Sequence, residues 1–66
     1  MNLIDRCLVE NNISLAVLSR ILGYDYSVLH RVYHDKQSIS RYMIMSLYMF
    51  MQLPYQVKKK LIDRNK

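Results

Sequence analysis

A single glycine, Gly23, constrains the fold of this chain more than any other residue. It lies within SLAVLSRILGYDYSVLHRVYH, residues 14–34, which carries apolar residues at helical spacing on both sides of the glycine. A glycine directly after a helix adopts the left-handed conformation without steric cost, so the chain can reverse direction there. Asp25 can then cap the next helix. The stretch therefore predicts two short helices joined by a tight turn.

The same spacing predicts three further helices, over residues 3–11, 41–52 and 54–64, the last with Pro54 in its first turn. Ser14 can cap the helix that follows it. Ser40 is a reasonable cap for the helix over 41–52, with Ser38 as the alternative, and that helix is apolar nearly all the way round. The residues of that helix expected to face the core are Ile44, Leu47, Tyr48 and Met51. No run with a period of two is bounded by turns, so no strand is expected. The prediction is an all-α fold in one domain, residues 1–66.

Ten Lys and Arg residues stand against five Asp and Glu residues, and the sequence pI is near 9.6. This balance suits a polyanionic partner such as nucleic acid, although a basic surface also serves solubility. Cys7 is the only cysteine, so it forms no internal disulfide and is expected in the core. With no signal peptide and no long apolar run, we expect no membrane partner and a cytoplasmic, nucleoid-associated location.

The chemistry-bearing residues do not form an enzyme-like set. The sequence has no Ser/His/Asp pattern, no paired carboxylates in a plausible cleft and no phosphate-binding glycine loop. His30 and His34 are four residues apart, but no third histidine or nearby cysteine joins them, and Asp35 is the only adjacent carboxylate. We therefore expect no enzymatic activity, no metal and no cofactor.

The order of key residues resembles the Cro/C1-type, or XRE-like, helix-turn-helix family over about residues 3–62. The residues that carry the resemblance are Ser14, Ser19, Gly23, Asp25 and Leu29. The resemblance implies a five-helix, lambda-repressor-like domain of phage or mobile-element origin. The sequence departs from the family at three positions. Asp35 and Gln52 stand where the family usually has glycine, and Tyr48 replaces a small residue.

The resemblance also implies a binding surface for double-stranded DNA. The residues matching base-contacting positions at the start of the recognition helix and one turn later are Tyr26, Ser27, His30 and Arg31. Arg31 has the best chemistry, because its planar guanidinium can donate two hydrogen bonds to one guanine. The residues expected to contact phosphates are Ser14, Leu15, His34, Lys36, Ser38, Ser40 and Arg41.

These expectations together predict a sequence-specific transcriptional regulator, a repressor that reads a near-palindromic operator as a homodimer. The expected dimer is built from the surplus apolar surface of the helix over 41–52 and from the final helix, with Met45, Met49 and Phe50 in the interface. Alternatively, the last helix covers these residues within one chain. Two other functions stay open: a phage inhibitor of host defence that binds a protein partner, as anti-CRISPR proteins with a similar domain do, and an RNA binder.

Overall fold

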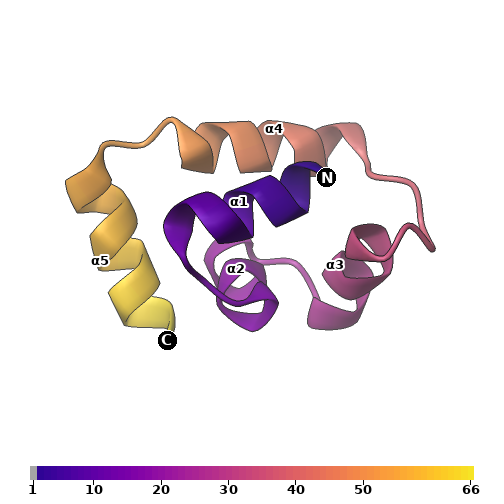
Figure 1. Cartoon of the computed structure of the whole chain (residues 1–66), viewed down its shortest axis with the longest axis horizontal. Helices are drawn as coiled ribbons and strands as arrows, with labels where there is room; N and C mark the ends of the chain where they lie inside the picture. The colour runs from indigo at the N-terminus through magenta and orange to yellow at the C-terminus, as the bar shows by residue number, and fades with distance from the viewer. Residues whose placement is uncertain (1) are drawn as a thin grey trace.

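The computed structural model describes residues 2–66, and within that range the chain forms five helices and no strand. The helices are α1 (Leu3–Asn11), α2 (Leu15–Leu22), α3 (Tyr26–Tyr33), α4 (Arg41–Met51) and α5 (Tyr55–Asn65). The expected all-α class is therefore confirmed. The molecule measures 33 × 20 × 19 Å, with α3 and α5 at opposite ends of its long axis and α4 running along one edge (Figure 1).

Side-chain caps fix where the first four helices begin. In each, a side-chain oxygen accepts a hydrogen bond of 2.8–3.2 Å from a backbone N–H in the first turn. The capping residues are Asn2, Ser14, Asp25 and Ser40. The capping roles expected for the last three are confirmed. Pro54 stands one residue before α5 rather than within its first turn, and no side chain caps that helix.

The turn between α2 and α3 has the backbone geometry expected from its glycine. Gly23 has φ +78°, and the N–H groups of Gly23 and Tyr24 both donate to the carbonyl oxygen of Ser19, at 2.9 and 3.1 Å. Asp35, after α3, is also left-handed, with φ +59°. A short polar side chain tolerates this conformation. Aspartate can therefore occupy this position, where the helix-turn-helix family that the sequence resembles usually has glycine. Gln52 has φ −87° and needs no glycine.

The core is a single apolar cluster drawn from the first four helices. Its buried members are Ile4, Cys7, Leu18, Leu29, Val32, Met43, Leu47 and Phe50. α4 faces this core with Met43, Leu47 and Phe50, so of the four residues expected to face the core only Leu47 is confirmed as buried. Tyr48 is 49% exposed, and Ile44 and Met51 are only half-buried. Because α4 is apolar on nearly every side, its sequence did not indicate which side packs inward.

This orientation corrects the prediction for Phe50. Its side chain is 3% exposed and packs in the core, so it cannot form a surface for a partner. Met45 and Met49 do remain exposed, at 52% and 65%. α5 does not cover them, because it packs against α2, where Nε of Arg20 donates to the carbonyl oxygen of Asn65 at 2.7 Å. For Met45 and Met49, the alternative in which the last helix shields them is therefore wrong.

Candidate nucleic-acid interface

The outward side of α3 gathers the side chains expected to contact bases. Together with His34, which was expected to contact a phosphate, they form what we call the α3 surface: Tyr26, Ser27, His30, Arg31 and His34. All are exposed except His30, which is half-buried. The rings of Tyr26, His30 and His34 form a row along the helix, with centroids 5.7 and 4.3 Å apart. Leu29 and Val32 of the same helix are buried, so the core fixes which side α3 presents to solvent.

Asp25 organises the start of the α3 surface. Its carboxylate accepts a hydrogen bond from the Ser27 hydroxyl at 2.6 Å and another from the Ser27 N–H at 2.8 Å. These two bonds hold the pKa of Asp25 below its ordinary value. Because the Ser27 hydroxyl donates its proton to Asp25, it is left to accept hydrogen bonds from outside. The exocyclic amino groups of adenine and cytosine are donors of that kind.

Arg31 is positioned by a residue that the sequence did not single out. Its Nε donates to Oε1 of Gln37 at 3.0 Å, across the bend that follows α3. The backbone supports the same bend, because the N–H of Lys36 donates to the carbonyl oxygen of Arg31 at 2.8 Å. The terminal amino groups of Arg31 stay available to an external acceptor. Gln37 lies in a polar stretch without periodicity, so no sequence signal pointed to this contact.

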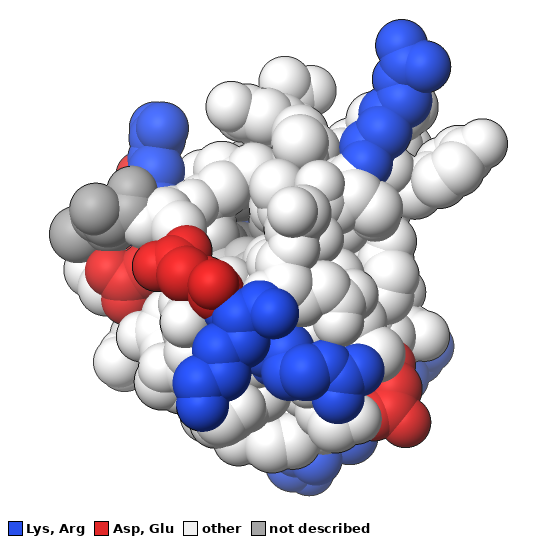
Figure 2. Space-filling view, turned by 90° about the vertical axis from the view of Figure 1, so that its right-hand side faces the viewer, with Lys and Arg blue, Asp and Glu red and all other residues white. Residues whose placement is uncertain are grey.

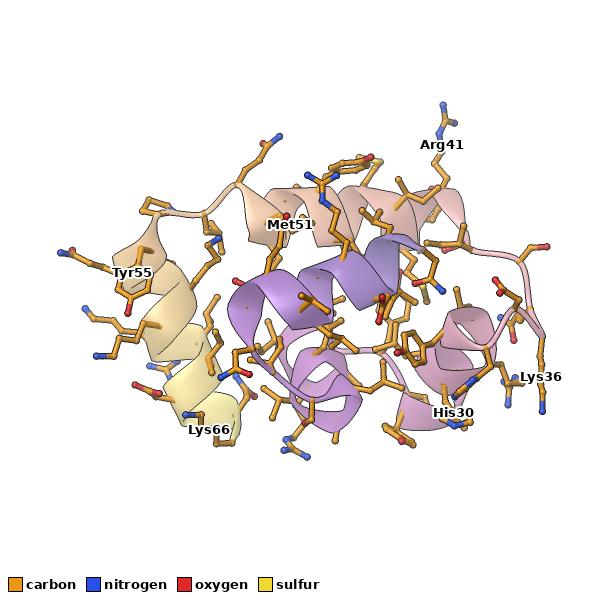
Figure 3. All side chains as sticks on the ribbon, viewed as in Figure 1. His30, Lys36, Arg41, Met51, Tyr55 and Lys66 are labelled. Atoms are coloured by element: carbon orange, nitrogen blue, oxygen red, sulfur yellow. The ribbon has the colours of Figure 1, made fainter. Side chains whose placement is uncertain are left out.

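The phosphate-contacting residues expected from the sequence lie in three places. His34, Lys36 and Ser38 are exposed at the α3 end of the molecule, where Figure 2 shows basic and acidic side chains next to one another. Ser40 is also exposed, but its hydroxyl oxygen caps α4 by accepting from the N–H of Met43 at 3.1 Å. Arg41 extends from α4 on the side of the molecule opposite His30 (Figure 3). The structure therefore does not bring Arg41 together with the α3 surface.

The remaining two phosphate-contacting candidates lie at the start of α2. Ser14 is exposed and caps the helix through the N–H of Val17. Leu15 is half-buried and packs against the core, so a contact from this residue has to come from its backbone N–H.

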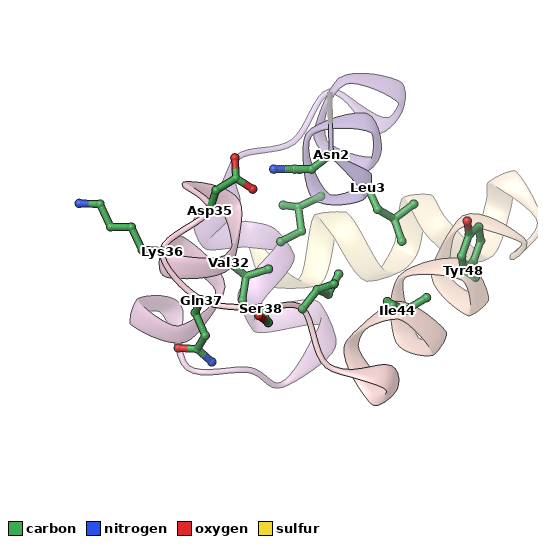
Figure 4. Close-up of a pocket in the computed structure, with 11 residues that line it drawn as sticks. Asn2, Leu3, Val32, Asp35, Lys36, Gln37, Ser38, Ile44 and Tyr48 are labelled. Carbon is green, nitrogen blue, oxygen red and sulfur yellow. The ribbon is translucent and has the colours of Figure 1, made fainter.

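A pocket of about 590 Å³ lies beside this region, between the start of α1, the end of α3, the 34–40 segment and α4 (Figure 4). Leu3, Ile4, Val32, Ile39 and Ile44 contribute apolar surface to it, and polar residues such as Asn2 and Asp35 lie on its rim. The side chain of Lys36 points away from it. Segments far apart in the sequence form this pocket, so no local pattern predicted it.

No metal-binding group of three or more His, Cys, Asp or Glu residues occurs among residues 2–66. The helices of this described range are also too short, or not apolar enough, to cross a bilayer.

Comparisons with protein-family models, with curated proteins and with solved structures found no match to the chain.

Proposed function

We propose that the chain is a sequence-specific DNA-binding transcriptional regulator, in which α2, the Gly23 turn and α3 form a helix-turn-helix of a lambda-repressor-like domain. One observation carries the proposal. α3 presents a row of exposed side chains that suit base contacts, on a helix fixed from behind by Leu29 and Val32. Placing such a helix in the major groove is how helix-turn-helix proteins read sequence.

Within this proposal, Arg31 is the principal base-reading residue. Its terminal amino groups donate to O6 and N7 of a guanine, and Gln37 restrains the side chain before DNA arrives. Ser27 accepts a hydrogen bond from an amino group of adenine or cytosine. Tyr26 contacts a sugar or the methyl group of a thymine, and His30 lies between these residues on the helix.

Contacts to the phosphate backbone of the DNA come from the segment that follows α3. Lys36 is exposed at the end of the molecule and supplies a positive charge to a phosphate. Ser38 and His34 add hydrogen-bond donors to the same strand, and the start of α2 offers a further N–H contact. The net charge of +5 favours the approach of the chain to DNA.

Duplex DNA fits the α3 surface better than duplex RNA does. The major groove of B-form DNA admits an α-helix, whereas that of A-form RNA is too deep and narrow for side chains to read. A second candidate function, inhibition of a host-defence protein, is favoured by one observation only: the exposed tyrosines and methionines on α4. Methionine-rich surfaces adapt readily to protein partners.

Selection from a pool of random duplexes tests the proposed function. We expect repeated rounds to enrich one sequence that contains a guanine, with an affinity that falls as salt rises. The control is the variant Arg31→Ala. Selection with this variant should show a weaker preference for guanine at that position. Equal affinity for every duplex, or equal affinity for duplex RNA, would contradict the proposal.

A further inference from the structure

The outward side of α4 is apolar and uncovered. It carries Tyr42, Met45, Tyr48 and Met49, exposed by 74%, 52%, 49% and 65%, and we call these four residues the α4 face. No charged residue occurs between positions 42 and 57 of the sequence. With roughly 200 Å² for each full side chain, the α4 face exposes about 480 Å². This is as large as the largest apolar patch of a typical monomer, and such patches are often functional.

The α4 face and the α3 surface lie on opposite sides of the molecule. Arg41, Met45 and Met49 are spaced four residues apart, so they follow one side of α4. Figure 3 shows Arg41 projecting from that side, away from His30 on α3. A partner on the α4 face therefore leaves the α3 surface free.

We propose that two copies of the chain pair through their α4 faces, and that the dimer bridges two segments of duplex DNA. In a two-fold pair, the symmetry axis lies in the plane where the two copies touch. The surfaces that lie farthest from this plane therefore face in opposite directions. Each α3 surface then meets its own duplex. This inference depends on the proposed DNA binding. This dimer differs from the one expected to read a near-palindrome. In that arrangement both recognition helices must lie on one side of the dimer, about 34–36 Å apart.

The charges on α4 favour an antiparallel pair. In a parallel pair the two Arg41 side chains would meet, with repulsion between like charges. In an antiparallel pair each Arg41 lies near the last turn of the other α4, which contains no basic residue. The carboxyl end of a helix attracts a positive charge.

A second copy also matches the size and composition of the α4 face. Two such faces, fully covered, bury about 960 Å² in total, close to the roughly 1,000 Å² that a specific interface needs. The four residues of the α4 face carry no charge that pairing would bury, and flexible methionines can adjust to each other across the axis. These values predict a weak dimer whose population depends on protein concentration.

Sedimentation tests the pairing without DNA. At micromolar concentration we expect the wild type to dimerise and Met49→Lys to stay monomeric. Val9→Lys is the matched control, because Val9 on α1 is also 65% exposed and the substitution adds the same charge. A monomeric wild type, or a dimer that survives Met49→Lys, overturns the proposal.

Disulfide trapping tests the direction of the two helices. Met45 lies near the middle of the α4 face, whereas Tyr42 lies at one end. Under mild oxidation we expect Met45→Cys to cross-link two copies and Tyr42→Cys to remain unlinked. Cys7 does not interfere, because it is buried. Efficient cross-linking of both variants indicates a parallel pair and overturns the antiparallel arrangement.

Bridging is measured with one duplex of arbitrary sequence on beads and a second, labelled copy in solution, at low salt, where phosphate contacts dominate. We expect the wild type and Val9→Lys to capture the labelled duplex, and Met49→Lys to bind the beads without capturing it. A wild-type dimer that binds the beads but captures no second duplex overturns bridging alone. If no variant binds either duplex while sedimentation still shows a dimer, the proposed function fails and bridging fails with it.

Discussion

Replacing Gly23 with alanine isolates the energetic cost of the turn between α2 and α3. Gly23 has φ +78°, and a Cβ atom built at this position would meet nothing within 4 Å. The substitution therefore creates no clash, and its cost comes from the backbone. A left-handed conformation costs an L-residue about 1–2 kcal/mol. The lower entropy of the unfolded chain offsets roughly 0.4–1 kcal/mol of this. We expect a net loss of about 1 kcal/mol.

Thermal and urea unfolding of the wild type, Gly23→Ala and Gly23→Asn would measure this cost. For a domain of this size, a loss of 1 kcal/mol lowers Tm by about 4–8 °C. Asparagine tolerates the left-handed conformation, so Gly23→Asn should lose less stability than Gly23→Ala. If Gly23→Ala unfolds at the same temperature as the wild type, the reasoning is refuted, because the turn then does not require positive φ.

Four further substitutions test the proposed interface and the core. Arg31→Ala should weaken binding to a selected operator by about 1–3 kcal/mol in a gel-shift titration, while Arg41→Ala, on the opposite side, should have little effect on a single duplex. Lys36→Ala should weaken binding to every duplex and reduce the slope of log affinity against log salt by about 0.9; an unchanged slope would exclude a phosphate contact. Burial raises the pKa of the Cys7 thiol from 9.0 to about 11, so the fold favours the neutral thiol. That stabilisation is complete below pH 9 and is lost as pH rises through 11, so the difference in unfolding free energy between wild type and Cys7→Ala should shrink over this range.

The parts of the fold that depend on local chemistry were predictable from the sequence. The capping roles of Ser14 and Asp25 and the turn at Gly23 each depend on neighbours within four residues, and the last two helices lie within one residue of their expected ends. The side of α4 that packs inward was not predictable, because an all-round apolar helix has no amphipathic signal. The contact between Arg31 and Gln37 depends on the path of an irregular segment, which no periodicity encodes.

The shortness of the helices has a consequence for how binding responds to temperature. None of the five exceeds eleven residues, and α3 has only eight. Helices this short are barely stable in isolation, so α3 keeps its shape only while Leu29 and Val32 remain packed in the core. Under the proposed function, folding and DNA binding would be one coupled equilibrium, in which bound DNA raises the melting temperature and heating releases the DNA. Under the proposed function, variants that impair regulation only at higher temperature should therefore map to buried positions such as Leu29 and Val32, and not to the exposed side chains that contact bases.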